Sequence, residues 1–366
     1  MDNEVVRTQL PEDIMIRVFS LLPIYAIIRL QLVCKQWKNI ISSKGFACLW
    51  SKISPPQLPL IIMYQSRDTI AAYDPSQAKW LTMGVTFPVG ITHRRILASD
   101  GGLICYGSFC ESNQLLIVCN PITKSWRILP ELGFSKERFL IGMKADTSRN
   151  SYIVYVVENL NDLSSFDVVS IKEEIRVMVY DSLDDCWDTH CFNEVEVKCG
   201  CKRDRAVWVN GFLFALSLTG PPHGLSIYNA KLDKWSRSLL PFERSIPLSP
   251  SVLNCHGRLI IAAGAWEFLP FSSFDIWELD KESGKLLKLD SVRCAALEQN
   301  TVEPLPVDTV NRIGDGKVLF FHARGMPCPF VCDLGSSMWK TLPRYRGPCL
   351  SKLDALLFRP SLFAEV

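Results

Sequence analysis

A short phrase recurs along this chain: an Asp or Asn stands six residues before a Trp. Its clear copies are "DPSQAKW" at 74–80, "NPITKSW" at 120–126, "DSLDDCW" at 181–187, "NAKLDKW" at 229–235 and "DLGSSMW" at 333–339. The last interval is about twice as long as the others and holds a degenerate copy, in which Leu286 follows Asp280 by six residues. Six copies at intervals of roughly 45–60 residues are typical of the blades of a β-propeller.

Each copy carries the signals of a β-hairpin. A strand-like run such as "LLIVC" or "VMVY" precedes the phrase, and the Trp opens a second run, as in "WRILP". The Asp or Asn side chain can accept hydrogen bonds from its own downstream backbone, and Pro75 and Pro121 fix φ at the next position. Upstream of most copies lies another hairpin signal, such as Asn210-Gly211 or Asp315-Gly316 between apolar runs. Two hairpins supply the four strands of one blade.

The last residue of each phrase is predicted to be structural, because it keeps a constant distance from a turn residue. These repeat positions are Trp80, Trp126, Trp187, Trp235, Leu286 and Trp339. A single blade cannot bury both of its faces, whereas neighbours stacked around an axis can. We therefore expect the Trp side chains to fill the wedges between adjacent blades.

Two copies depart from the pattern. The third has Asn150 where a Gly is expected and a longer insert before "RVMVYD", and the first lacks a clear inner strand. The strand-like tail "DALLFRPSL" has no other evident place. We expect this tail to complete the first blade and to close the ring.

The first fifty residues have helical periodicity instead of strand alternation. Ile14, Val18, Leu21 and Leu22 fall on one face of a helix. A Pro is favourable in a first helical turn, and Pro23 ends this helix and begins the next, so three short helices are predicted. So small a helical unit makes a weak core by itself. It needs a partner surface, either its own propeller or another protein.

The apolar and basic positions of this segment follow a definite order. The order is Leu10-Pro11, Ile14, Leu22-Pro23, Arg29, Val33-Cys34-Lys35 and Trp37. It closely resembles the F-box, and the repeats over roughly 58–366 resemble the kelch and F-box-associated repeats of plant proteins. The resemblance implies an F-box at 1–50, a linker at 51–57 and a kelch-like propeller at 58–366 closed by its C-terminal strand. The expected fold class is α+β and multidomain: three helices, then about six four-stranded blades.

The resemblance also implies a partner, since the family's F-box docks on the Skp adaptor of SCF (Skp–cullin–F-box) ubiquitin ligases. The residues that form or support this contact by resemblance are Leu10, Pro11, Ile14, Leu22, Pro23, Val33, Cys34 and Trp37. Core packing is the alternative for every apolar residue of the three helices. We favour core packing for Val18, Leu21 and Trp37, and an interface role for Leu10, Pro11 and Ile14.

Composition excludes several other classes of protein. The net charge of +2 is too balanced for a chain that coats nucleic acid or an anionic membrane. No apolar run reaches the roughly 18 residues that span a bilayer, and the acidic start does not read as a secretory signal. The 14 cysteines are scattered singly through apolar runs. We expect reduced thiols in the cytoplasm, the nucleus or both.

The sequence lacks the usual motifs of metal-binding and catalytic sites. The stretch 186–201, "CWDTHCFNEVEVKCGC", gathers Cys and His residues, but without the paired spacing that zinc sites use. The five histidines have no metal-binding spacing, and neither a phosphate-binding loop nor a nucleophile elbow is present. The prediction is therefore no metal, no cofactor, no catalytic residue and no enzyme. The alternative is a propeller enzyme of the kelch-oxidase type, which binds copper through Tyr and His.

The function expected from the resemblance is that of a substrate-recognition subunit of an SCF-type ubiquitin ligase. The F-box is expected to bind the Skp adaptor, and the cullin through it, while propeller loops bind an unknown target protein. Trp266, in an apolar loop-like stretch, is a candidate substrate-binding residue, and the insert 158–174 is a candidate recognition loop. A non-degradative scaffold that binds the adaptor is a further alternative.

Overall fold

The computed structural model begins with a helical unit. It describes residues 10–53, 59–66, 68–85, 87, 94–110, 113–133, 139–159, 175–192, 206–217, 224–239, 248–255, 257–264, 273–280, 285–293, 310–315, 318–323, 328–333, 336, 338–344, 355–362 and 364–366. The described helices are α1 (Glu12–Ser20), α2 (Ile24–Leu30), α3 (Lys35–Ile41) and α4 (Lys44–Ile53). The sequence predicts three helices, and that number is wrong. The missed helix, α4, extends past the expected boundary at residue 50.

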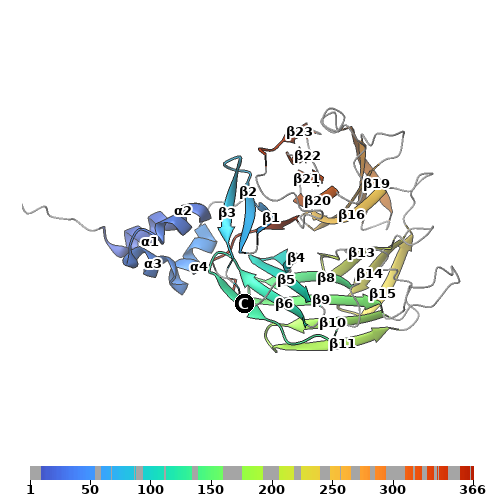
Figure 1. Ribbon diagram of the computed structural model, residues 1–366, viewed down its shortest axis with the longest axis horizontal. Coiled ribbons are helices and arrows are strands. Elements are labelled where there is room, and N and C mark those ends of the chain that lie inside the picture. The colour runs from blue at the N-terminus through green and yellow to red at the C-terminus, as the bar shows by residue number, and fades with distance from the viewer. Residues whose placement is uncertain are drawn as a thin grey trace, which may run out of the picture.

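The described strands form six four-stranded sheets, which are the blades of a propeller (Figure 1). Blade 1 contains β24 (Ala355–Phe358), β1 (Leu60–Ser66), β2 (Thr69–Asp74) and β3 (Lys79–Gly84), and blade 2 contains β4 (Arg94–Asp100), β5 (Leu103–Cys110), β6 (Asn113–Asn120) and β7 (Ser125–Ile128). Blade 3 contains β8 (Phe139–Asp146), β9 (Ser151–Asn159), β10 (Ile175–Asp181) and β11 (Cys186–Phe192), and blade 4 contains β12 (Val207–Val209), β13 (Phe212–Ser217), β14 (Gly224–Asn229) and β15 (Lys234–Leu239). Blade 5 contains β16 (Leu248–Cys255), β17 (Arg258–Gly264), β18 (Ser273–Leu279) and β19 (Leu286–Arg293), and blade 6 contains β20 (Val310–Asp315), β21 (Val318–Ala323), β22 (Phe330–Asp333) and β23 (Met338–Thr341).

The innermost strands make a closed ring. Along the order β4, β8, β12, β16, β20 each strand contacts the next, and β24 contacts both β20 and β4. β24 also pairs antiparallel with β1, with Leu60 opposite Phe358 and Met63 opposite Ala355. Blade 1 is thus assembled from the two ends of the propeller segment, and its hydrogen bonds close the ring.

The repeated phrase has the same register in all six sheets. It sets the last residue of the phrase opposite the residue just before its Asp or Asn: Tyr73↔Trp80, Cys119↔Trp126, Tyr180↔Trp187, Tyr228↔Trp235, Leu279↔Leu286 and Cys332↔Trp339. The turn between them begins as its chemistry predicts. Asp74 Oδ1 accepts a hydrogen bond from the Ser76 N–H at 2.8 Å, and Asp181 Oδ1 accepts one from the Leu183 N–H at 2.9 Å. Leu286 therefore occupies the place of a repeat Trp.

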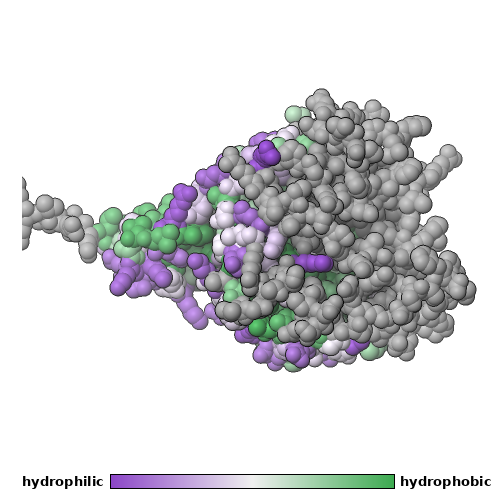
Figure 2. Space-filling view, in the orientation of Figure 1, coloured by the Kyte–Doolittle hydropathy of each residue, from purple (hydrophilic) through white to green (hydrophobic). Residues whose placement is uncertain are grey.

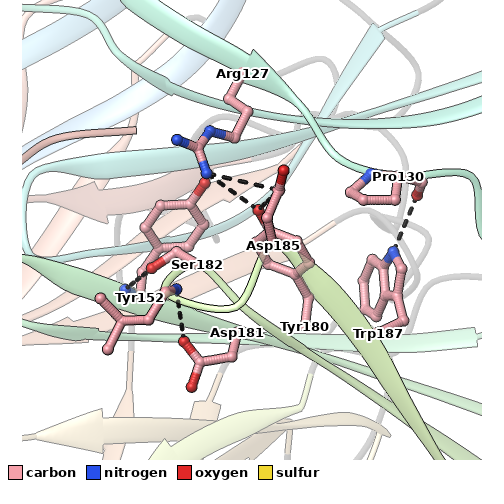
Figure 3. Close-up of polar contacts among 9 residues, drawn as sticks. Arg127, Pro130, Tyr152, Tyr180, Asp181, Ser182, Asp185 and Trp187 are labelled. Carbon is pink, nitrogen blue, oxygen red and sulfur yellow. Dashed lines mark hydrogen bonds and ion pairs between the residues drawn. The ribbon is translucent and has the colours of Figure 1, made fainter.

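Two of the repeat Trp side chains link neighbouring blades. The Trp187 indole N–H donates to the Pro130 carbonyl at 2.9 Å (Figure 3). The Trp80 indole N–H donates to the Pro343 carbonyl at 2.9 Å. Each accepting proline stands four residues after the repeat Trp of the preceding blade, as in "WRILP" at 126–130. The link between blades is therefore encoded within the repeat itself.

A polar network lies beside the Trp187 link. Arg127 of blade 2 places its Nη1 3.4 Å from the Tyr180 hydroxyl and 3.6 Å from Asp185 Oδ1 (Figure 3). The same hydroxyl donates to Asp185 Oδ1 at 2.6 Å. Burial and, after it, this hydrogen bond raise the pKa of Tyr180 above its ordinary value. The hydroxyl therefore remains a donor that ties the end of β10 to its own turn.

The helical unit shares a core with the propeller. One apolar cluster contains Met15, Phe19, Ile27, Phe46 and Trp50 of the helices together with Ile62, Ile70, Ile104, Ile117 and Phe358 of blades 1 and 2. The helices lie on one side of the propeller, with α4 beside blades 1 and 2 (Figure 1). The two parts are therefore packed together and are not separated by a free linker.

A matched pair of variants can measure how much the Trp187 hydrogen bond contributes to the free energy of unfolding. Trp187→Phe keeps most of the aromatic surface but removes the indole donor, whereas Trp126→Phe changes a Trp at the same register that is 41% exposed. We expect Trp187→Phe to lower the free energy of unfolding in urea by about 1 kcal/mol more than Trp126→Phe, because it leaves the Pro130 carbonyl unpaired. Equal losses in the two variants would show that the bond adds nothing to the packing of the blades.

Candidate protein-binding surface

The helices bury one apolar face and expose another. The buried set packs into the cluster shared with the propeller and includes Met15, Phe19, Ile24, Ile27, Ile40 and Ile41. The exposed set outside α4 has residues that are 39% to 84% accessible and consists of Leu10, Ile14, Val18, Leu21, Leu32 and Val33. Figure 2 shows hydrophobic residues gathered at the helical end of the molecule, away from the propeller. The exposed set is called the outer apolar surface below.

Helix α1 supplies much of this surface because it carries two apolar stripes. Ile14, Val18 and Leu21 are spaced at i, i+4 and i+7, so they share one side of the helix. Met15 and Phe19 begin one residue later and share the side that faces the core. A helix with both stripes can bury one apolar side in the core and still expose the other apolar side to solvent.

The start of α1 fixes the position of Pro11. Pro11 precedes α1 with φ −53°, and its carbonyl accepts hydrogen bonds from the Ile14 and Met15 N–H groups at 3.1 Å each. Glu12 and Asp13 lie in the first turn, where the helix dipole favours negative charge. This arrangement places Pro11 at the exposed end of α1.

The turn between α2 and α3 adds the second part of the surface. The Val33 N–H donates to the Leu30 carbonyl at 3.1 Å, which ends α2 and turns the chain. Cys34 then caps α3, because its Sγ accepts from the Trp37 N–H at 3.5 Å. Leu32 and Val33 therefore project from a tight turn and are exposed.

The residues assigned to the adaptor contact by sequence divide into two groups. Leu10, Pro11, Ile14, Val33 and Cys34 are exposed, and Leu22, Pro23 and Trp37 are half-buried. The half-buried residues hold the helices together. The Leu22 carbonyl accepts from the Trp50 indole at 3.1 Å, and the Trp37 ring meets the Phe19 ring edge-on at 5.0 Å.

Two of the residues predicted to pack in the core do not do so. Val18 is 50% exposed and Leu21 is 61% exposed, so the prediction for these two is wrong, whereas Trp37 does pack against the cluster. The sequence also gave no reason to single out Leu32. Periodicity groups residues on one side of a helix, but it does not say which of two apolar sides faces the core. The sequence did contain one signal for the correct assignment. Val18 and Leu21 are spaced so that they lie on the same side of the helix as Ile14, which was assigned to the interface.

The outer apolar surface has the properties of a protein contact. Burial of a large apolar side chain against a partner contributes about 1.5–3 kcal/mol. Several such side chains gathered on one small unit, with Glu12, Asp13 and Lys35 nearby, make an apolar area with a polar surround. Exposed areas of this kind mark interaction sites.

The propeller has two unlike faces. Strands alternate in direction within each blade, so the tight turns at Asn210-Gly211 and 182–185 lie on one face. β1 begins and β24 ends on this same face, which therefore carries the helices. The strand ends joined by 160–174, 193–206 and 294–309 lie on the opposite face. The longer connections of the ring thus leave the face remote from the helices.

The other candidate sites lie wholly or partly outside the described residues. Trp266 is outside them, as are 160–174 of the insert 158–174 and two of the cysteines of the stretch 186–201. Cys186 and Cys191 of that stretch are free, exposed thiols on β11. Among the described residues, no cluster of three or more His, Cys, Asp or Glu is placed to hold a metal ion. The described helices include none long and apolar enough to cross a membrane.

The surroundings of His190 and of the buried cysteines do not resemble a metal-binding or catalytic site. His190 on β11 places Nε2 3.1 Å from Asp188 Oδ2 and Nδ1 3.0 Å from Asp233 Oδ2, which belongs to the next blade. Burial raises the pKa of the Cys105 thiol to about 12 and raises that of Cys119 as well. These two thiols stay protonated near neutral pH, and a protonated thiol is a poor nucleophile and metal ligand.

Comparisons with known proteins agree with this arrangement. Residues 8–49 match the family described as "F-box domain". An F-box/kelch-repeat protein of Arabidopsis thaliana is 30% identical over 70% of this chain, and the match spans 65% of that relative's length. SKP1-interacting partner 15 of Arabidopsis thaliana is 28% identical over 35% of this chain and 39% of its own. A solved structure described as "Crystal structure of Nidogen/Laminin Complex" covers 83% of this chain and 100% of its own, with a TM-score of 0.50 and 9% identity, so this likeness concerns the fold alone.

The two stripes of α1 differ in what they do for stability. Ile14→Ser removes an exposed apolar side chain and is expected to change the free energy of unfolding by no more than about 0.5 kcal/mol. Phe19→Ala empties a position that is 4% exposed and is expected to cost about 3–5 kcal/mol. Urea unfolding of both variants measures the difference. A large loss for Ile14→Ser would place the outer apolar surface inside the core.

Proposed function

Because the chain is a plant-type F-box protein, with its F-box at residues 8–49 in front of a β-propeller, we propose that it is the substrate-recognition subunit of an SCF-type ubiquitin ligase. In this proposal the F-box binds a Skp-type adaptor and, through it, a cullin. The propeller binds the protein to be ubiquitinated. The protein acts in the cytoplasm, the nucleus or both.

The observation that carries the proposal is the outer apolar surface. Leu10, Ile14 and Val33 lie within the F-box match and are exposed, although the same helices already bury another apolar face in the cluster that they share with the propeller. Among the described residues this second apolar face is exposed, and it is available to a partner. The similarity to a protein named as a SKP1-interacting partner supports a Skp-type adaptor as that partner.

The proposed target site lies on the propeller face remote from the helices. The longer connections leave that face, and binding residues are commonly carried on loops held by a rigid scaffold. The protein contributes proximity to the reaction and no bond chemistry of its own. It holds the target at a high effective concentration near the ubiquitin-carrying enzyme. The shared core between helices and propeller suits this task, since it keeps the two binding sites at a fixed separation.

The alternative of a copper-binding propeller enzyme gains no support from His190. This histidine lies on β11, the outermost strand of blade 3, and both of its ring nitrogens face carboxylates. It is therefore remote from the innermost strands that surround the axis. The alternative of a non-degradative scaffold shares the adaptor contact, so it is separated from the main proposal only by the fate of the target.

Adaptor binding can be tested with purified components. We expect wild-type protein to bind a Skp-type adaptor, and the Leu10→Ala/Pro11→Ala double variant to bind at least about tenfold more weakly, because apolar area is lost from the contact. Leu232→Ala is the matched control, since Leu232 is 62% exposed against 61% for Leu10 but lies on a turn of blade 4. Calorimetric titration of the three proteins gives the dissociation constants. Absence of wild-type binding, or equal binding of the double variant, contradicts the ligase proposal.

Target recognition is tested by protein abundance in cells. Removal of residues 1–50 would expose the core that the helices share with the propeller, so the double variant is the better reagent. We expect a defined set of proteins to bind both forms but to be more abundant and less ubiquitinated with Leu10→Ala/Pro11→Ala. Quantitative proteomics after affinity capture measures both properties. Bound proteins whose abundance and ubiquitination are the same with both forms would instead identify a non-degradative scaffold.

A further inference from the structure

The residues after β24 run across the face that carries the helices. Residues 359–362 and 364–366, called the strap below, follow the closing strand of blade 1. The strap is bound by side chains from blade 2 and blade 3 and lies close to α4. It therefore touches blades 2 and 3 and the helical unit.

The main anchor of the strap is the buried side chain of Asn120. Its Nδ2 donates to the Ser361 carbonyl at 3.0 Å and to the Ala364 carbonyl at 2.9 Å. Its Oδ1 accepts from the Ile122 N–H at 2.9 Å and starts the turn of blade 2, as an Asp does in blades 1 and 3. An Asp would serve the turn equally well. Only an amide can also donate two hydrogen bonds, so the strap explains why Asn stands here.

Further contacts hold the strap on the propeller. Asn150 Oδ1 accepts from the Glu365 N–H at 3.2 Å, and this Asn has φ 53°. Gly102 allows a close approach, because a Cβ at this position would lie 2.3 Å from the Ser361 Cβ. Ala364 and Val366 pack against the apolar cluster of blades 2 and 3. The strap is thus fixed along most of its length.

Other contacts join the strap to the helices. Leu362 packs against the cluster that contains Phe46 and Trp50 of α4 as well as residues of blades 1 and 2. Glu365 Oε1 lies 3.7 Å from Lys44 Nζ at the start of α4. This ion pair is exposed and is worth little by itself. The apolar contact of Leu362 is the stronger link.

We propose that the strap is a joint element that fixes the orientation of the helical unit on the propeller. It bridges the seam between α4 and blades 1 to 3, and Asn120 is the residue that holds it there. The strap sets the angle between the outer apolar surface and the far face of the propeller. The strap fixes this angle in the unbound chain, so the proposal does not depend on which partner the helices bind.

The test uses the full chain and a matched pair of substitutions. Asn120→Asp keeps the oxygen that starts the turn but replaces the donor with a carboxylate oxygen facing two carbonyls. Asn229→Asp makes the same change in blade 4, where Oδ1 accepts from the Lys231 N–H at 3.0 Å. We expect Asn120→Asp to speed hydrogen exchange about tenfold or more in 364–366 and in α4, and Asn229→Asp to leave both at wild-type rates. Small-angle X-ray scattering of Asn120→Asp should show a broader distribution of distances between the helices and the propeller.

Several outcomes would overturn the proposal. One is faster exchange in 364–366 with unchanged exchange in α4 and unchanged scattering, which would make the strap a passive tail. Another is wild-type exchange in both regions. If Asn120→Asp does not fold, Asn150→Gly tests the same point, because Gly tolerates the positive φ while removing the acceptor for the Glu365 N–H. A smaller acceleration in 364–366 and α4 then supports the joint, and no acceleration contradicts it.

Discussion

The pairing of β24 with β1 is the interaction on which the rest of the structure depends. Each blade is an open sheet, and its innermost strand contacts the innermost strands on both sides. Without β24, blade 1 would lose that strand, and β20 and β4 would lose their common neighbour. Leu60 and Phe358 are far apart in sequence, so this pairing costs considerable chain entropy. In return it converts a row of repeats, in which each unit needs only its neighbours, into a ring that is completed by both ends.

Ring closure also determines where the two ends of the propeller segment go. β1 and β24 are antiparallel, so the start of one lies beside the end of the other. The helices precede β1 and the strap follows β24, and both must therefore emerge on the same face. The contact between Lys44 and Glu365 and the place of Leu362 in the shared cluster follow from this constraint. The long connections leave the other face, so the two kinds of surface are separated by the thickness of the blades.

Much of the propeller could be predicted from the sequence because its signals are local. The Asp or Asn, its turn and the following Trp lie within seven residues, and the same spacing identified Leu286 as part of a degenerate copy, the fifth along the chain. Asn150 looked like a departure, but the turn is built locally as well: Asp146 Oδ1 accepts from the Ser148 N–H at 2.9 Å, and Asn150 supplies the positive φ. A residue that tolerates the left-handed region replaced the expected Gly.

Features that depend on distant contacts could not be predicted in the same way. Helix α4 buries Phe46 and Trp50 in the cluster that the helices share with blades 1 and 2, so its stability comes from tertiary packing that the sequence does not reveal. The roles of Val18 and Leu21 were assigned wrongly because α1 has two apolar stripes, and only the packed structure shows which one is covered. Asn120 looked like an ordinary turn residue, because its two strap contacts are to residues 241 and 244 positions away in the sequence.

The two stripes of α1 give the helical unit a mechanical role as well as a binding role. If only the outer stripe of α1 were apolar, α1 would add nothing to the core shared with the propeller, and the helices would be attached less firmly. Effective concentration falls as a tether becomes longer and more flexible. Because Met15 and Phe19 are locked in the core shared with blades 1 and 2, the outer stripe is held in a fixed direction. A protein bound to Ile14 and its neighbours is thereby held at a fixed position relative to the far face of the ring.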